Sequence, residues 1–349
     1  MKINILLIIG IITMAGLLGS CENQDVVYPD FDYQTVYFAN QYPVRTVELG
    51  ADLFVDNSMD NEHKISIKAT TGGAYSNKND ITIDFKVDES LCDSLYFKEK
   101  AGEGAKVVPM PADYYQLADN KITIPSGSII GGVEVKLTDA FFKDTNSLRK
   151  NYVIPLFLTN VQGADSILRG KPAIENPDRC VDDNWSIKPR DFVLYAVKYV
   201  NQWHGVYLRR GTDHITQLDG SQVNFVRHEQ YVEDDDTVSI STVSLTKAAL
   251  SLPLYSTDST IIDVAHVMLT FTDDENCTIA GETNNFTVTG SGKFVPKGDK
   301  NSIGGTDRDA LYLNYTVKYK LFSLKFETSD TLVVRDRGVA PEYFSVVRK

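Results

Sequence analysis

The residues with the clearest chemical role lie at the amino terminus, where a cysteine directly follows two small residues. Lys2 precedes an apolar run over residues 3–18, and the run ends in the tetrapeptide LGSC at residues 18–21. This layout is typical of a signal peptide with a lipobox, in which cleavage occurs before the cysteine and the Cys21 thiol accepts a diacylglycerol. A transmembrane anchor is the alternative, because the run is nearly long enough to span a bilayer. The sequence predicts a signal peptide over residues 1–20 and an exported chain held to a membrane through Cys21.

Motifs of the common hydrolases and metalloenzymes are not found in the chain. None of the five histidines forms His-Glu-x-x-His, and neither a Gly-x-Ser-x-Gly elbow nor a phosphate-binding Gly-x-x-x-x-Gly-Lys occurs. The acidic segment 84–89 looks like a glycosidase motif, but its side chains alternate along an expected strand and do not converge. We therefore expect no catalytic residue and no cofactor. Two scattered carboxylates would still suffice for a glycosidase, so a small glycosidase is kept as a third interpretation.

Two dense acidic runs, residues 233–236 and 273–275, supply the oxygen ligands that calcium prefers. Neither run matches an EF-hand loop, and both fall near expected turns. We interpret them as solvated turns and predict no metal site.

Aromatic and amide side chains offer a different chemistry, the binding of sugars. The chain has two tryptophans, and one of them lies in a segment rich in hydrogen-bonding groups. Tryptophan rings can meet the C–H face of a sugar while neighbouring polar groups bind its hydroxyls. The candidate ligand-binding residues are Trp203, Trp185, His204, Asn201, Tyr231 and Tyr312. The alternatives are that Trp203 closes the end of a barrel and that Trp185 packs between domains.

The charge and the cysteine content of the chain limit the classes of partner that it can bind. The formal charge of −12 and the lack of a basic stripe argue against nucleic-acid binding. Anionic lipid headgroups would repel such a chain, so membrane attachment is expected through the lipid anchor only. Besides Cys21 there are three cysteines with no C-x-x-C spacing, which favours buried thiols over disulfides or zinc. They are Cys92, Cys180 and Cys277.

The elements that must position these residues are short strands. Residues 81–88 and 311–320 alternate apolar and polar side chains, and no window shows a helical apolar stripe. The pattern predicts an all-β chain with a tether over 21–33 and an immunoglobulin-like sandwich over 34–165. A proline-containing linker over 166–190 follows, and then residues 191–349 as an antiparallel up-and-down barrel or a second sandwich. The segment 192–200 is expected to open that barrel.

Several segments of the first domain resemble a known module: residues 87–91, 110–115, 122–127 and 151–156. This module occurs at the amino terminus of surface lipoproteins of gut Bacteroidetes, including lipoproteins that carry family-18 endoglycosidase barrels. Residues 195–211 resemble the start of an all-β carboxy-terminal domain found in non-enzymatic members. The resemblance implies a glycan-binding lipoprotein associated with starch-utilisation-type uptake systems.

The leading hypothesis is therefore a cell-surface, lipid-anchored, non-catalytic protein that binds a glycan or oligosaccharide at the extracellular face of the outer membrane. Outer-membrane glycan importers are the expected protein partners. We expect the first domain to act as a spacer and the second to present the ligand surface. The alternative is an adhesin or structural assembly protein that contacts other proteins through exposed strand edges.

Overall fold

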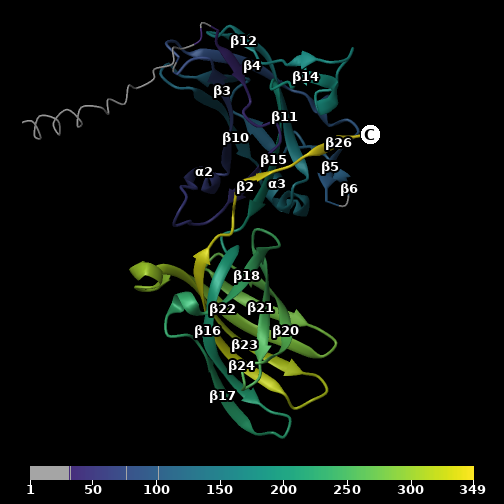
Figure 1. The fold of residues 1–349 in the computed structure, drawn as a ribbon. Helices are drawn as coiled ribbons and strands as arrows, with labels where there is room; N and C mark the ends of the chain where they lie inside the picture. The colour runs from purple at the N-terminus through teal and green to yellow at the C-terminus, as the bar shows by residue number, and fades with distance from the viewer. Residues whose placement is uncertain (1–30, 32, 76, 101) are drawn as a thin grey trace, which may run out of the picture.

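The computed structural model describes residues 31, 33–75, 77–100 and 102–349, which form two all-β parts (Figure 1). The signal peptide, Cys21 and most of the tether lie outside the described residues. No helix in the described part of the chain is long and apolar enough to cross a bilayer. We call the part built by residues 35–200 the first module and the part built by residues 205–336 the barrel.

The first module is organised by one large sheet that wraps around its own core. Its strand order is β12-β1-β3-β10-β9-β4-β11-β15-β2-β25, with β7 beside β11 and β8 beside β10. The bounds are β1 (Thr35–Tyr37), β2 (Pro43–Glu48), β3 (Lys64–Gly72), β4 (Ile81–Val87), β7 (Val108–Pro109), β8 (Tyr115–Leu117), β9 (Lys121–Ile124), β10 (Ile130–Leu137), β11 (Tyr152–Gln162), β12 (Ser166–Ile167), β15 (Phe192–Val200) and β25 (Glu342–Tyr343).

Smaller elements fill the edges of the first module. A three-stranded sheet has the order β26-β5-β6, and β13 pairs with β14 in a two-stranded ribbon. Their bounds are β5 (Leu95–Glu99), β6 (Gly102–Lys106), β13 (Lys171–Pro172), β14 (Trp185–Ile187) and β26 (Val346–Arg348). The short helices are α2 (Ser58–Asn61), α3 (Asp139–Lys143), η1 (Glu89–Cys92), η2 (Thr145–Leu148) and η3 (Asp182–Asn184).

The position of β15 corrects the expected domain boundaries. We expected Phe192–Val200 to open the barrel, but it pairs with β11 and β2 inside the first sheet. The reason is its composition: almost every residue is apolar, so both faces can be buried. Val193 and Val197 face the main core, whereas Phe192 and Leu194 face a second apolar cluster. The first module therefore extends to residue 200, and the expected linker contains β12, β13 and β14.

The barrel is a closed meander of eight antiparallel strands, as the alternating sequence pattern predicts. Its order is β16-β18-β19-β20-β21-β22-β23-β24, and β24 returns to pair with β16. The bounds are β16 (Gly205–Thr216), β17 (Gln222–Arg227), β18 (Asp236–Thr242), β19 (Lys247–Tyr255), β20 (Ile261–Phe271), β21 (Asn276–Glu282), β22 (Phe286–Asp299), β23 (Arg308–Tyr319) and β24 (Lys325–Asp336), with η4 (Val232–Asp234) and η5 (Ile303–Gly305) in loops. Inward-facing Leu311, Leu313 and Val317 of β23 join one apolar core.

The seam between β18 and β19 has a short strand ladder, and a side chain makes a further contact beyond it. β18 pairs with β19 only between residues 240–242 and 248–250. Farther along β19, Pro253 has no N–H to donate, and the Arg209 guanidinium donates to its carbonyl at 2.8 Å. Arg209 is almost fully buried, and it reaches this seam from the barrel interior.

A compact ionic network fills the barrel beside this seam. Arg209 Nε lies 2.9 Å from Asp330 Oδ2, and Arg227 Nη2 lies 2.6 Å from Asp330 Oδ1. Asp213 accepts from Arg227 at 2.8 Å, and the Tyr315 hydroxyl donates to Asp330 at 2.9 Å. Two arginines and two aspartates balance in charge, so the groups stabilise one another away from water.

The carboxy terminus returns from the barrel to the first module (Figure 1). β25 pairs with β2, and β26 pairs with β5. The return begins at Arg337, whose guanidinium donates to the carbonyls of Leu49, Ala51, Asn201 and His204 at 2.7–3.0 Å. Two segments that are distant in sequence, residues 49–51 and 201–204, are therefore bound to one side chain where the two parts meet.

Candidate functional site

Trp203, the leading sequence-based candidate, lies in the barrel core. Its side chain is 4% exposed, and its ring stacks on Phe271 with centroids 3.7 Å apart. The indole N–H donates to Glu275 at 3.2 Å. Trp203 closes the end of the barrel nearest the first module, as the alternative interpretation describes. Its faces are not available to a sugar.

Asn201 and His204 lie in the same region as Trp203, at the junction where the first module meets the barrel. Asn201 is 1% exposed and donates to the carbonyls of Ser244 and Lys247 at 2.8 and 3.0 Å. His204 Nδ1 accepts from the backbone N–H of Thr242 at 3.3 Å. Burial lowers the pKa of His204 to about 4, with the charges of Arg337 and Lys198 acting in the same direction. Both side chains therefore connect elements of the junction.

The remaining candidates are dispersed. Trp185, in β14, is half-buried, and its indole N–H donates to the backbone carbonyl of Asp178 at 2.7 Å. The guanidinium of Arg179 lies 5.9 Å from its ring. Tyr231 is 57% exposed beside η4, and Tyr312 donates to the carbonyl of Gly298 at 3.1 Å. The structure does not bring the six predicted residues into one site.

Each acidic run also has a structural contact. Asp235, buried, pairs with Arg210 at 2.6 Å, and Glu275 binds Trp203 and Gln202. In the described ranges, no three His, Cys, Asp or Glu side chains are grouped to hold a metal ion. Cys92, Cys180 and Cys277 are free and buried, which confirms the expectation for those thiols.

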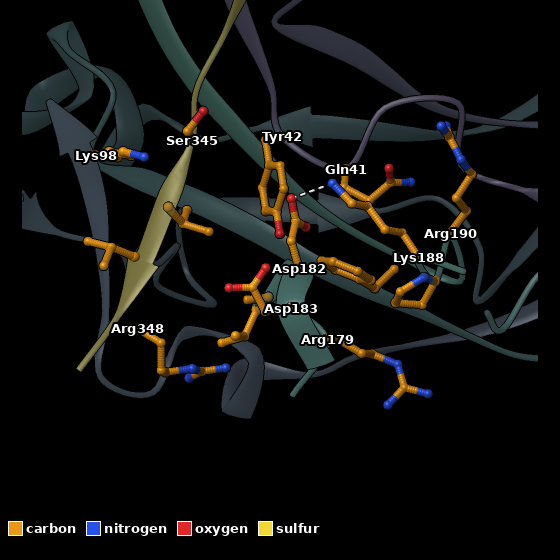
Figure 2. A pocket seen from close by; sticks show the side chains of 16 residues that line it. Gln41, Tyr42, Lys98, Arg179, Asp182, Asp183, Lys188, Arg190, Ser345 and Arg348 are labelled. Atoms are coloured by element: carbon orange, nitrogen blue, oxygen red, sulfur yellow. Dashed lines mark hydrogen bonds and ion pairs between the residues drawn. The ribbon is translucent and has the colours of Figure 1, made fainter. Parts of the chain in front are cut away.

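A cavity of about 640 Å³, which we call the Tyr42 pocket, lies in the first module, outside the predicted site (Figure 2). It has the volume of a ligand pocket. Four separate segments line it: residues 41–42 before β2, Lys98 of β5, residues 179–192 around η3, and residues 345–348 of the returning chain. We expected the ligand surface in the barrel, but this pocket places a ligand-sized space in the part that was expected to be a spacer.

The floor of this pocket is aromatic. The Tyr42 ring meets Phe192 and Phe344 edge-on, with centroids 6.0 and 5.4 Å away. Burial raises the pKa of the Tyr42 phenol, and the nearby Cys180 and Asp182 raise it further. Burial likewise raises the pKa of the Cys180 thiol to about 12. Both groups are neutral at physiological pH, so Cys180 is no thiolate nucleophile.

Charged side chains surround the floor. Arg179 makes a two-point contact with Asp191 at 3.0 and 3.1 Å, Arg348 lies 2.7 Å from Asp178, and Lys188 pairs with Asp182. Figure 2 shows Asp182 and Lys188 pointing toward each other beside Tyr42.

Two exposed lining residues, Lys98 and Asp183, have no ion-pair partner within the described ranges. The Lys98 ammonium and the Asp183 carboxylate, beside an aromatic floor, can bind a polar, uncharged ligand through its hydroxyl groups.

Sequence reasoning missed this pocket because its walls come from the expected linker and from the last residues of the chain. The one signal in the sequence was a group of charged residues between prolines, Asp182, Asp183 and Lys188. These residues were interpreted as part of the linker over 166–190. Their proximity to Tyr42 depends on β15 entering the first sheet and on β26 pairing with β5.

Comparison with known proteins gives the relationships of the chain. The family DUF5627, a domain of unknown function, matches residues 202–338, and a family described as an N-terminal domain matches residues 31–165. A crystal structure of a Bacteroides ovatus protein of unknown function is 55% identical, covers 91% of this chain and 100% of its own, and superposes with a TM-score of 0.82. The chain belongs to the family of that protein.

More distant structures are also similar. A second Bacteroides ovatus protein of unknown function is 13% identical with a TM-score of 0.41, covering 87% of this chain and 94% of its own. An auxiliary nutrient binding protein from Bacteroides thetaiotaomicron is 13% identical with a TM-score of 0.31, covering 86% and 95%. At these TM-scores the likeness carries no inference about this chain. A search of curated proteins finds no match.

Proposed function

We propose that this protein is a non-catalytic glycan-binding protein of the cell surface, anchored through acylated Cys21 and binding its ligand in the Tyr42 pocket. The observation that carries the proposal is the pocket itself: about 640 Å³, an aromatic floor and a rim of charged groups. Such a lining can bind sugar hydroxyls while the ring supports an apolar sugar face.

The protonation states favour binding over bond cleavage. The Cys180 thiol is protonated, and none of the residues that line the pocket is a histidine. A nucleophile needs a lowered pKa or an adjacent base, and Cys180 has the opposite shift.

Isothermal titration against a panel of plant and host oligosaccharides tests the proposal. Lys98→Ala and Asp183→Ala are the informative variants, because both side chains are exposed on the rim and their loss leaves the fold intact. We expect at least about tenfold weaker binding for each, corresponding to loss of a charge-assisted hydrogen bond. Lys68→Ala, an exposed site on β3 outside the pocket, is the matched control. Full affinity in both pocket variants would move the site elsewhere.

Two further measurements separate the parts of the proposal. Cys21→Ser should move the protein from the membrane fraction to the soluble fraction, and mass spectrometry should find a diacylated amino terminus in the parent. Product analysis on the same oligosaccharide panel should show no cleavage. Appearance of shorter products would make the protein a small glycosidase instead.

A role in surface assembly is a second candidate, favoured by the end of the barrel farthest from the first module (Figure 1). Its turns expose large apolar side chains: Leu218 is 65% exposed, Leu321 82% and Phe322 62%. Exposed apolar groups that gather on one surface mark protein contacts. Affinity capture with intact protein and with a Leu321→Ser, Phe322→Ser variant tests this role, and a partner lost only from the variant would support it.

A further inference from the structure

A small cavity of about 60 Å³ lies where the first module meets the barrel. Its walls are the loop 51–54 after β2, the end of β22, the start of β23 with the guanidinium of Arg308, and the end of β24. The ring of Phe54 lies over Arg308, 5.5 Å from ring centroid to guanidinium carbon. This cavity is separate from the Tyr42 pocket.

The guanidinium of Arg308 is the feature that needs a partner. Arg308 is 8% exposed, and its Nε and Nη1 are buried without a hydrogen-bond acceptor in the described part of the chain. The neighbouring carboxylates serve other donors. Asp52 accepts from the N–H groups of Phe54 and Val55 at 2.6 and 2.8 Å, and Asp309 accepts from the N–H of Lys297 at 2.7 Å.

A buried charge with unused donors is costly, so native structures satisfy such groups with a side chain, a water or an ion. Four cationic side chains line the cavity against three carboxylates, which leaves one positive charge. The lining residues are Lys297, Arg308, Arg335 and Arg337, with Asp52, Asp309 and Asp336. A single negative charge neutralises these lining groups. A phosphate dianion would exceed their net charge and would be repelled by the three carboxylates.

We propose that the cavity is a binding site for one carboxylate group, held by Arg308 and covered by Phe54. A planar carboxylate accepts two N–H bonds from one edge of a guanidinium, and such an edge joins Nη2 with either Nε or Nη1 of Arg308. The volume fits the head of a small acid. The carboxylate belongs either to a free organic acid or to a uronic acid unit of a glycan. Because loop 51–54 comes from the first module and Arg308 from the barrel, the bound group joins the two parts.

Thermal unfolding of the mature chain in buffer without small anions tests the site. Sodium acetate, sodium glucuronate and sodium chloride are added at matched ionic strength. We expect acetate to raise the Tm of the parent in a saturable way, by about 2 °C or more. A glucuronate shift at lower concentration identifies a sugar acid as the source, and an acetate shift alone identifies a free acid. Equal shifts from chloride and acetate would overturn the carboxylate assignment.

Arg308→Met is the informative variant, and Lys318→Met, which replaces an exposed lysine of β23 outside the cavity, is its control. Replacing an unpartnered buried charge by an apolar side chain relieves its desolvation cost. We therefore expect Arg308→Met to have a higher Tm than the parent without added anion and no response to acetate, while Lys318→Met still responds. A lower Tm for Arg308→Met without anion, or a parent that ignores acetate, would refute the proposal. Lys98→Ala should leave this response unchanged.

Discussion

The junction between the two parts contains two ionisable groups, buried Glu48 and half-buried His204. Their pKa values are shifted so that the two groups make stability depend on pH in opposite directions. Glu48 is 5% exposed and lies 3.5 Å from Arg337. Burial raises its pKa from 4.5 to about 7, against the attraction of Arg337 and with help from Asp52 and Asp60. Burial lowers the pKa of His204 from 6.5 to about 4.

The signs follow from which state holds the proton. Between pH 4.5 and about 7, folded Glu48 keeps a proton that the unfolded chain releases, so its contribution to stability is lost as the pH rises. Between about pH 4 and 6.5, the unfolded chain binds a proton on His204 that the folded state refuses, so stability is gained as the pH rises. Each shift is about 2.5 pKa units, which corresponds to about 3 kcal/mol. In the parent the two effects nearly cancel.

Single substitutions should separate the two effects. Glu48→Gln mimics the protonated acid and leaves only the His204 effect. Relative to the double variant, the free energy of unfolding of Glu48→Gln should therefore rise by about 3 kcal/mol from pH 4 to 6.5. His204→Asn keeps an acceptor for Thr242, and its free energy of unfolding should fall by about 3 kcal/mol from pH 4.5 to 7. Urea unfolding at several pH values, followed by tryptophan fluorescence, measures both slopes.

The double variant is the control, because it carries neither group. Its pH profile gives the contribution of all other ionisable residues, and the slopes of the single variants are compared with it. If both single variants follow the profile of the double variant, the burial-driven shifts do not exist and the reasoning is refuted.

Three further outcomes follow from the packing. Asp330→Asn should cost about 3–5 kcal/mol in barrel stability, because Arg209 and Arg227 lose the carboxylate that they share; a cost below about 1 kcal/mol by urea unfolding would contradict this. Trp203→Ala should cost a similar amount by leaving a cavity in the closed end of the barrel, and an unchanged midpoint would mean that the stack is not stabilising. Deleting residues 345–349 should abolish ligand binding in the Tyr42 pocket while the barrel unfolds at its usual temperature; retained binding would exclude β26 from the site.

The secondary structure was largely readable from the chain, because strand alternation is a local property. Residues 311–320 show it clearly, and in the structure Leu311 and Leu313 of β23 lie in the core. The role of Trp203 was partly readable as well, since an aromatic residue before a first barrel strand often closes the barrel. The prediction that Phe192–Val200 opens the barrel was wrong, because a strand that is apolar on both faces fits any buried position.

By itself the sequence determined an all-β chain, a meandering barrel, buried thiols and an amino terminus with the pattern of a lipidated export signal. Only the tertiary structure decided which segments come together to line the two cavities. The Tyr42 pocket needs residues 41–42 and 345–348 as walls of one cavity, and Arg308 becomes a buried guanidinium without a partner only when loop 51–54 covers it. The physical reason is that side-chain periodicity reports the burial of each strand face, whereas the neighbours of that face are set by pairings between segments hundreds of residues apart.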